Sequence, residues 1–324
     1  MKACLCKSFG PPSNLLIEEM PDPVAGAGEV VVSVQACALN FFDTLIIQGR
    51  YQYKPDMPFS PSAEFAGVVE ATGEGVGKVS VGDRVMGYMR WGAAREMVSV
   101  READLVHLPD AVSFEVAAGM AVTYGTTLHA FRDRAKLKAG ETVAVLGASG
   151  GVGQAAVEIA TVMGAKVIAC ASSEEKLGFA RELGAELTID YSTQPLKETL
   201  KELTGGDGVN VVYDPVGGDL SEQALRATAW EGRFLVIGFA AGDIPKIPLN
   251  IVMLKGCDVQ GVFWGASVDR DPDAHRSNME QVLKWVGEGK LKPHVHAVYP
   301  MEEISAALEE IAARRVRGKV IVKP

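Results

Sequence analysis

The sequence predicts an α/β protein with two domains, one rich in β-strands and the other built on a doubly wound parallel sheet. The length of 324 residues is typical of two domains. Short apolar strands separated by Gly, Pro and Asp fill the region before Ser113. After Ser113 strand and helix patterns alternate, and this order is typical of parallel strands joined by helical crossovers.

The β-rich region contains three clear strand patterns, at residues 29–36, 65–71 and 83–88. Such short strands favour a small barrel or sandwich. Cys4 and Cys6 lie in a further alternating run, so both should face the same side of a strand and pack in the core. From residue 113 to 131 an apolar stretch predicts a helix with a break near Gly125.

The parallel sheet is predicted from five strand patterns, at residues 142–146, 166–171, 187–190, 209–214 and 233–238. A helix is predicted from Val152 to Met163, where apolar residues recur at helical spacing. Ser172 and Glu175 are expected to form the capping box of the next helix. Two more helices are predicted, at residues 195–203 and 220–229.

The C-terminal segment has a different pattern, which begins after Gly265. It predicts a helix near 279–286, a strand within 292–299, a helix near 302–313 and a last strand at 319–322. This segment is too small to form a core of its own, so we expect it to pack on the β-rich domain. The predicted domains are therefore residues 1–121 with 270–324, and residues 122–269.

Composition narrows the classes of partner. A net charge of −9 argues against nucleic acid and anionic membrane as partners. The five cysteines are odd in number and scattered, so no disulfide framework is visible and a cytoplasmic location is expected. No uncharged stretch is long and apolar enough to span a bilayer.

The strongest motif is a glycine-rich turn, Leu146-Gly147-Ala148-Ser149-Gly150-Gly151-Val152-Gly153. It follows a predicted strand and opens a predicted helix, which is the context of a dinucleotide-binding loop. Glycines let backbone N–H groups approach a pyrophosphate, and the helix N-terminus adds partial positive charge. The residues predicted to bind a dinucleotide here are Gly147, Ser149, Gly150, Gly151, Val152 and Gly153.

The end of the second strand of the sheet distinguishes NADPH from NADH. It carries no carboxylate of the kind that usually binds the ribose of NAD. Serine and tyrosine hydroxyls and one lysine are available instead for a 2′-phosphate. Two glutamates next to the lysine oppose this interpretation, but the charges together favour NADPH. The residues expected to hold the phosphate are Ser172, Ser173, Lys176 and Tyr191.

Six further segments are typical of one known family: Asn40-Phe41-Phe42-Asp43, Gln48-Gly49-Arg50-Tyr51, Glu64-Phe65-Ala66-Gly67, Gly82-Asp83-Arg84-Val85, Thr123-Tyr124-Gly125-Thr126 and Asp214-Pro215-Val216-Gly217-Gly218. Over nearly the whole chain, the sequence resembles the medium-chain dehydrogenase/reductase family. It is most similar to zinc-free NADPH:quinone oxidoreductases of the zeta-crystallin type. The resemblance implies a β-rich GroES-like catalytic domain and a Rossmann nucleotide-binding domain.

The resemblance also implies roles for particular residues. Ser172, Lys176 and Tyr191 match positions at which the family binds the 2′-phosphate. Thr126 resembles a threonine that approaches the nicotinamide, and Asn40 is also expected to contact the cofactor there. Gly238 and Phe239, at the end of a predicted strand, are expected to contact the cofactor as well. A homodimer is expected, in which an edge strand at 258–264 pairs across the two-fold axis.

A zinc site of the family's kind is not expected in this chain. The zinc alcohol dehydrogenases of the family have a cysteine at the position of Asn40, a histidine at the position of Ala63 and another cysteine near Ala118. A catalytic zinc needs three protein ligands, and these positions supply none. In the same region, Ser62 replaces a glycine that the family often has.

Hydride transfer without a metal favours substrates that delocalise their own negative charge. Quinones and α,β-unsaturated carbonyls are such substrates. Asn40 offers an amide donor, and Tyr51 offers a hydroxyl that can donate a hydrogen bond or a proton. The expected function is therefore NADPH-dependent reduction of quinones or conjugated carbonyls.

Two other functions remain open. One is a 2-enoyl thioester reductase, because Asn40, Asp43 and Tyr51 also resemble that branch of the family, where the matching tyrosine acts in catalysis. The other is a non-catalytic NADPH-binding structural or regulatory protein, since cofactor binding alone is not catalysis.

Overall fold

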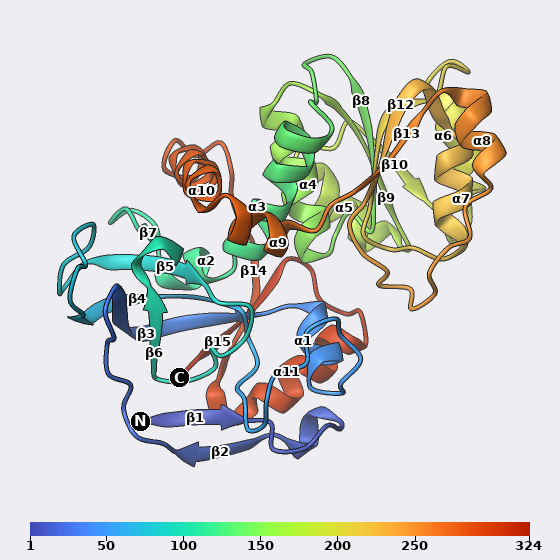
Figure 1. The fold of residues 1–324 in the computed structure, drawn as a ribbon. Helices are drawn as coiled ribbons and strands as arrows, with labels where there is room; N and C mark the ends of the chain where they lie inside the picture. Colours follow the sequence, from blue (N-terminus) through green and yellow to red (C-terminus); the bar gives the residue numbers. More distant parts are fainter. The chain divides into compact units, whose positions relative to one another are not determined.

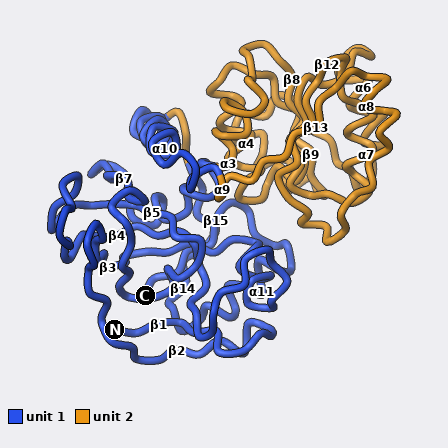
Figure 2. Tube along the Cα trace, viewed as in Figure 1, with its two compact units in different colours: residues 1–125, 267–289, 293–324 blue, residues 126–266, 290–292 orange.

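The computed structural model describes residues 1–324 and divides them into two compact units (Figure 2). Unit 1 comprises residues 1–125, 267–289 and 293–324, and unit 2 comprises residues 126–266 and 290–292. The chain leaves unit 1 within helix α3 (Ala121–Leu128) and returns within helix α9 (Trp264–Arg270). None of the helices combines the length and the apolar character that crossing a bilayer requires.

Unit 1 is built on a seven-stranded sheet. Its strand order is β14 (Val295–Pro300), β15 (Lys319–Lys323), β3 (Glu29–Leu39), β4 (Glu64–Thr72), β5 (Arg84–Tyr88) and β7 (Leu105–His107), and β6 (Met97–Arg101) pairs with β3. The strand predictions at 29–36, 65–71 and 83–88 are confirmed as β3, β4 and β5. Strand β3 is largely buried, because it pairs with β15, β4 and β6 and because its sequence is rich in Val and Ala.

A separate hairpin of β1 (Lys2–Leu5) and β2 (Leu16–Glu19) covers part of the same core. Cys4 and Cys6 belong to this core and are 0% and 1% exposed, as the alternating pattern predicts. Three helices of unit 1 are α1 (Phe41–Ile46), α10 (Pro272–Gly287) and α11 (Ile304–Ala312). Helix α10 begins earlier than predicted, because Asp271 caps it by accepting a hydrogen bond from the Ala274 backbone and Pro272 starts it.

The C-terminal segment returns to unit 1, as predicted. Strand β15 pairs with β3 through Val320–Leu39, Ile321–Ala38 and Val322–Cys37, and β14 pairs with β15. The central position of β15 places residues from the far end of the sequence beside β3 and β4.

The predicted helix break near Gly125 is wrong. The helix instead divides at Gly119, between α2 (Phe114–Ala118) and α3, and Gly125 lies inside α3. The backbone bends where Gly119 faces Lys319: a Cβ at Gly119 would lie 3.1 Å from Lys319 Cγ. A glycine inside a helix is only mildly unfavourable, so Gly125 need not end one.

Unit 2 contains a six-stranded parallel sheet (Figure 1). Its order is β10 (Leu187–Asp190), β9 (Lys166–Ala171), β8 (Thr142–Leu146), β11 (Val209–Asp214), β12 (Thr228–Val236) and β13 (Asp258–Gly261). Figure 1 shows α4 (Gly151–Val162) on one face, and α6 (Leu196–Leu203), α7 (Asp219–Arg226) and α8 (Leu249–Lys255) on the other. This is the predicted doubly wound arrangement.

Two boundaries in unit 2 differ from the predictions. Strand β12 starts at Thr228, because Thr228 pairs with Val209, and the predicted helix at 220–229 therefore ends at Arg226. The predicted edge strand at 258–264 ends at Gly261, because the chain turns there into α9, which starts at Trp264. The strand β13 itself does lie at the edge of the sheet.

Candidate functional site

The glycine-rich turn joins β8 to α4 at the carboxyl edge of the parallel sheet. Gly147 has φ +60°, a conformation that favours glycine. A Cβ on Gly153 would lie 2.1 Å from the Gly147 carbonyl oxygen, so only glycine allows the helix to pack this closely against the turn. The predicted residues Gly147, Ser149, Gly150, Gly151, Val152 and Gly153 all lie in this turn or in the first turn of α4.

The start of α4 suits an anionic ligand. Its N-cap is Gly150, which has no side chain to satisfy the first backbone N–H groups, and its first turn carries no acidic residue. The uncapped N–H groups and the helix dipole favour a pyrophosphate at this position.

Three of the predicted 2′-phosphate residues come together at the ends of β9 and β10. Lys176 Nζ donates to Ser172 Oγ at 3.2 Å. Tyr191 follows β10, and its backbone N–H donates to the Ala171 oxygen at the end of β9 at 3.0 Å. A lysine, a serine and a tyrosine are thus gathered at one edge, where they can accept a phosphate.

The predicted capping box of Ser172 and Glu175 is wrong. The N-cap of α5 (Glu174–Glu182) is Ser173, whose Oγ accepts the Lys176 backbone N–H at 3.4 Å. Because Ser173 caps the helix, Ser172 remains at the strand end, where its hydroxyl meets the Lys176 ammonium.

Of the two glutamates next to Lys176, Glu174 repels a phosphate less than an unpaired carboxylate would. Glu174 pairs with Arg181 at 2.7 Å, and this hydrogen bond lowers the pKa of Glu174. The local charge of Glu174 is therefore balanced by a partner on its own helix.

Other loops meet the glycine-rich turn at the same edge of the sheet. A Cβ on Gly147 would lie 2.9 Å from Val216 Cγ2, which places the loop after β11 beside the turn. Asp214 orders that loop, since it accepts backbone N–H groups from Val216 at 2.8 Å and Gly217 at 2.9 Å. The loop after β12 contains Gly238 and Phe239, and the Gly238 N–H donates to the backbone carbonyl oxygen of Asp214 at 3.3 Å.

Thr126 lies in α3 and is 8% exposed. Thr123, one turn earlier in the same helix, donates its hydroxyl to the backbone oxygen of Gly119 at 2.8 Å. The structure shows no such bond for Thr126, so its hydroxyl is available to a ligand.

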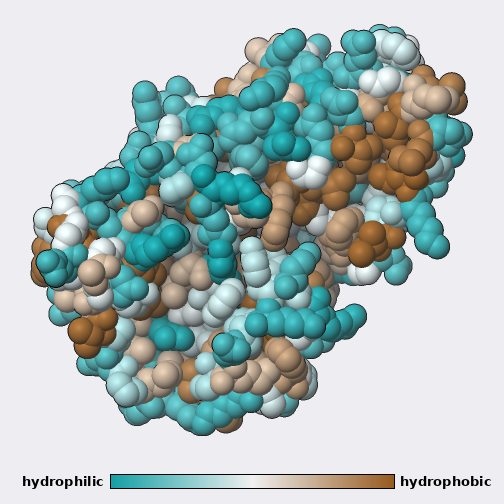
Figure 3. Space-filling view, viewed as in Figure 1, coloured by the Kyte–Doolittle hydropathy of each residue, from teal (hydrophilic) through white to brown (hydrophobic).

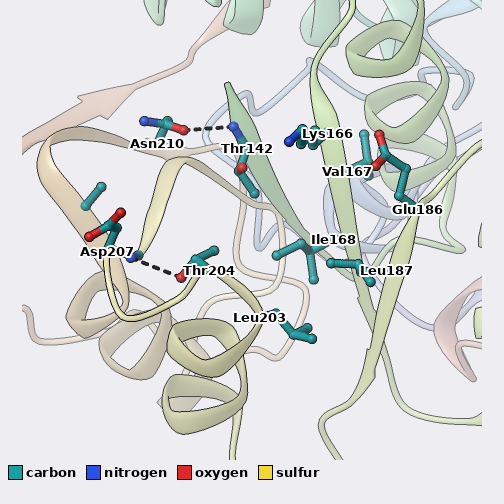
Figure 4. Close-up of a pocket in the computed structure, with 12 residues that line it drawn as sticks. Thr142, Lys166, Val167, Ile168, Glu186, Leu187, Leu203, Thr204, Asp207 and Asn210 are labelled. Atoms are coloured by element: carbon teal, nitrogen blue, oxygen red, sulfur yellow. Dashed lines mark hydrogen bonds between the residues drawn. The ribbon is translucent and has the colours of Figure 1, made fainter. Parts of the chain in front are cut away.

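A cavity of about 550 Å³ lies at the other end of the strands of the unit 2 sheet, where the strands begin (Figure 4). Its lining includes Thr142 and Lys166, the first residues of β8 and β9, and Leu187, the first residue of β10. Ligands of doubly wound sheets bind at the carboxyl ends of the strands, so this cavity is separate from the cofactor edge.

Unit 1 holds the two predicted catalytic residues. Asn40 precedes α1, and its backbone N–H donates to Asp43 Oδ2 at 2.7 Å. Its side chain is 8% exposed and bonds inside the protein: Nδ2 donates to Glu64 Oε1 at 2.8 Å, and Oδ1 accepts from Lys319 Nζ at 2.6 Å. Asn40 is therefore a member of a buried polar cluster, with one of its two Nδ2 hydrogens engaged.

Glu64 and Lys319 form the buried ion pair of this cluster, at 2.9 Å and with exposures of 1% and 4%. Lys319 Nζ also donates to the Leu39 oxygen at 3.0 Å. Glu64 Oε2 accepts the backbone N–H of Val122, in the first turn of α3, at 2.8 Å. Neither residue is predicted as a site residue from the sequence, although Lys319 stands directly before the apolar run Val320–Val322 and is a visible signal.

Ser62 adopts φ +68°, a left-handed conformation that favours glycine. Its N–H donates to Asp43 Oδ1 at 2.8 Å, and its hydroxyl donates to the Ala38 oxygen at 2.9 Å. These bonds offset part of the backbone strain. Asp43 is consequently fixed between two backbone donors, from Asn40 and Ser62.

Asp43 should make the stability of the protein depend on pH. Burial raises its pKa to about 7, against the lowering effects of its backbone donors and Lys319, while Glu64 adds to the rise. A raised native pKa gives stability that is complete below about pH 4 and is lost as the pH rises through about 7. Relative to Asp43→Asn, the wild-type unfolding free energy should fall by at most about 1.4 kcal/mol per pH unit in this window. Chemical denaturation at several pH values measures it, and parallel curves for both proteins would refute it.

Tyr51 lies in a row of aromatic side chains in unit 1. Its ring stacks on Phe42 with centroids 5.2 Å apart and meets Tyr53 edge-on at 5.9 Å. The ring centroids of Tyr53 and Trp91 lie 6.0 Å apart, and the Arg90 guanidinium lies 5.4 Å from the centroid of the Tyr53 ring. The rings are all partly exposed, so the row offers flat apolar surface.

The residues of unit 1 do not fit the zinc that one branch of this fold class binds. No group of three or more His, Cys, Asp and Glu side chains is placed to hold a metal ion. The thiol of Cys37, on β3, is fully buried. Burial raises the pKa of Cys37 to about 12, so this thiol stays protonated and is a poor metal ligand. The cation next to Glu64 is the Lys319 ammonium.

Comparison with known proteins agrees with this architecture. The family model described as "Alcohol dehydrogenase GroES-like domain" matches residues 26–110, and the one described as "Zinc-binding dehydrogenase" matches residues 151–288. Quinone oxidoreductase-like protein 2 of Rattus norvegicus is 39% identical over 322 residues, which cover 99% of this chain and 91% of the relative. Quinone oxidoreductase of Pseudomonas aeruginosa is 34% identical, with 98% of each chain covered. The crystal structure of Escherichia coli quinone oxidoreductase complexed with NADPH has a TM-score of 0.91 and 28% identity, with 100% of each chain covered.

The fold and the glycine-rich turn thus define an oxidoreductase with a dinucleotide-binding domain. The chain belongs to the medium-chain dehydrogenase/reductase family, in its quinone oxidoreductase branch. The predicted GroES-like and Rossmann architecture is confirmed.

Proposed function

We propose that this oxidoreductase uses NADPH to reduce quinones or other conjugated carbonyl compounds by hydride transfer, without a metal ion. The observation that carries the proposal is the Asn40 cluster: an amide donor stands beside a buried ammonium where a metal-dependent relative needs metal ligands. A hydrogen-bond donor suffices when the substrate spreads its own charge.

NADPH fits the edge of the unit 2 sheet, where it supplies the hydride when bound. The turn from Gly147 to Gly153 takes the pyrophosphate, and Ser172, Ser173, Lys176 and Tyr191 take the 2′-phosphate. Gly238 and Phe239 line the same edge, and Thr126 contributes a hydroxyl to the nicotinamide. The NADPH complex of the Escherichia coli relative supports this choice of cofactor.

The substrate binds against unit 1. Asn40 donates a hydrogen bond to the substrate oxygen, and the partly exposed ring of Tyr51 offers flat surface and a hydroxyl. We retain residues 1–121 with 270–324 as the catalytic domain and residues 122–269 as the nucleotide-binding domain.

A 2-enoyl thioester reductase is the second candidate function, and Tyr51 is the observation that favours it. Reduction of an enoyl thioester produces an enolate whose carbon must be protonated in place. Tyr51 carries a hydroxyl whose pKa is raised to about 12 by burial, with smaller contributions from Tyr53 and Asp43, so the phenol keeps its proton for this step.

One screen separates these functions and the non-catalytic alternative. NADPH oxidation is measured with a quinone, a cyclic enone and an enoyl-CoA, with NADH as the control cofactor. We expect turnover with the quinone or the enone. Turnover with enoyl-CoA alone would favour the second function, and tight NADPH binding without turnover on any substrate would favour a structural or regulatory role.

Metal independence has its own test. The chelated protein should keep its full kcat and contain less than one zinc ion per chain, because the residues of unit 1 offer no set of three ligands. Elemental analysis and activity before and after chelation check this. Bound zinc whose removal abolishes turnover would overturn it.

We also propose that the protein is a homodimer that pairs through β13. This strand is the edge of its sheet, so one row of its backbone groups is left for another strand. Figure 3 shows a hydrophobic patch on the part of unit 2 that carries α8 and β13. The exposed apolar residues of this region are Trp230, Ile244, Leu249, Met253, Leu254, Val259 and Phe263.

The double variant Leu249→Glu/Met253→Glu should be monomeric. These side chains are 78% and 72% exposed in the single chain, and charge there opposes burial in an interface. Light scattering should give twice the chain mass for the wild type and the single mass for the variant. Val24→Glu, at an apolar residue 86% exposed in unit 1, is the control and should remain dimeric. A monomeric wild type would exclude the dimer.

The cellular compartment is a further proposal. All five cysteines are free thiols, and all are buried, at 0–4% exposure. A chain with free thiols and no disulfide is suited to a reducing compartment such as the cytoplasm.

A further inference from the structure

Asn40, Glu64 and Lys319 form a buried cluster in which nearly every polar hydrogen of the three side chains is donated to an acceptor within the protein. An ammonium has three N–H donors, and those of Lys319 meet three acceptors: the Leu39 oxygen, Asn40 Oδ1 and Glu64 Oε1. The Lys319 side chain is therefore fully satisfied and has no hydrogen left for a ligand.

Glu64 is equally engaged. Its Oε1 accepts from Lys319 and from Asn40 Nδ2, and its Oε2 accepts from the Val122 N–H in the first turn of α3. A carboxylate at a helix N-terminus is favourably placed with respect to the helix dipole. The pair is thus anchored at both ends, by β15 and by α3.

These charges determine which way the Asn40 carboxamide points. Its oxygen faces the ammonium and its nitrogen faces the carboxylate, at 2.6 and 2.8 Å. A flipped amide would turn N–H donors toward the ammonium and its oxygen toward the carboxylate, and both contacts would be repulsive. One Nδ2 hydrogen is bound to Glu64, so the second Nδ2 hydrogen is the side-chain donor of the cluster that remains for a ligand.

We propose that Glu64 and Lys319 are positioning residues, which hold the Asn40 carboxamide so that its second Nδ2 hydrogen meets the substrate oxygen during hydride transfer. This rests on the proposed function, in which Asn40 contacts that oxygen. A buried ion pair often stabilises a fold no better than apolar residues of the same size, so stability alone does not account for it. Gly119 leaves space for the Lys319 stem, since a Cβ there would lie 3.1 Å from Lys319 Cγ.

The test compares Asn40→Ala, the double variant Glu64→Gln/Lys319→Met, and the triple variant that combines them. The double variant removes both charges together and nearly preserves volume, so no lone charge is left buried. Single-turnover reduction of a benzoquinone and of cyclohexenone by NADPH gives the rate, fluorescence titration gives the Kd of NADPH, and thermal denaturation confirms folding.

Asn40→Ala should slow hydride transfer by about 10²-fold, as expected for the loss of one donor to a developing oxyanion. The double variant should be slowed by about 10-fold or more, with the Kd of NADPH unchanged. The triple variant should be no slower than Asn40→Ala, because the pair acts through Asn40. A purely structural pair would instead give independent losses that multiply, or no loss.

The outcomes separate the two proposals. If Asn40→Ala reduces substrates at the full rate, the assignment of Asn40 in the proposed function fails. If Asn40→Ala is slow while the folded double variant keeps the full rate, only the positioning role fails. Should the double variant not fold, Lys319→Arg decides: it keeps the charge but cannot match the three acceptors, and an unchanged rate would overturn the proposal.

Discussion

Tyr51→Phe should lower kcat for a conjugated enone by at least about 10²-fold while leaving the rate with a quinone nearly unchanged. An enolate formed by hydride transfer must receive a proton on carbon, whereas a reduced quinone is protonated readily by water. Burial, followed by the nearby Tyr53 and Asp43, raises the pKa of Tyr51 to about 12, so the phenol keeps its proton at neutral pH. A strongly basic enolate can still take that proton.

The matched control for this experiment is Tyr53→Phe. Tyr53 meets Tyr51 edge-on at 5.9 Å, and the change removes one hydroxyl from the same aromatic row. Single-turnover rates are measured with both substrate classes. The rate with the enone should fall for Tyr51→Phe and not for Tyr53→Phe, and neither change should slow the reduction of the quinone. A Tyr51→Phe enzyme at the full rate on every substrate would show that Tyr51 only packs, and equal losses in both variants would indicate damage to the row.

Lys176→Ala should raise the Kd of NADPH by about 10- to 150-fold, which corresponds to the roughly 1.5–3 kcal/mol of a hydrogen bond to a charged group. The Lys176 ammonium lies 3.2 Å from Ser172 Oγ at the end of β9, where the phosphate is proposed. The Kd of NADH should stay the same, because NADH has no 2′-phosphate. Calorimetric titration of both cofactors measures the ratio.

Lys166→Ala is the control for cofactor binding. Lys166 is the first residue of β9, the strand that ends just before Ser172. It lines the cavity at the other end of the strands (Figure 4). Its loss should leave both dissociation constants unchanged. Equal weakening of NADPH and NADH by Lys176→Ala would mean that Lys176 supports the helix and that the phosphate binds elsewhere.

The parallel sheet was the part of the fold that could be predicted best. The strands Thr142–Leu146, Lys166–Ala171 and Val209–Asp214 start and end where their apolar patterns do. Strands buried on both faces are continuous apolar runs, and the turns at their ends are marked by Gly and charged residues. The cofactor loop followed from the same local pattern, because its glycines are adjacent in sequence.

The polar cluster of unit 1 could not be predicted in the same way. Glu64 and Lys319 are 255 positions apart, and their contact depends on the pairing of β15 with β3. The break at Gly119 also depends on this pairing, since the Lys319 side chain lies against it. Local periodicity contains no information on which distant strand will occupy the neighbouring position in a sheet.

The burial of all five cysteines has a consequence for chemical resistance. Quinones and enones are electrophiles that alkylate thiolates, and the thiolate is the reactive form of cysteine. Burial raises the pKa of every one of the five thiols. If quinones or enones are the substrates, as proposed, the protein exposes almost no thiolate to them, and its own substrates should be poor inactivators.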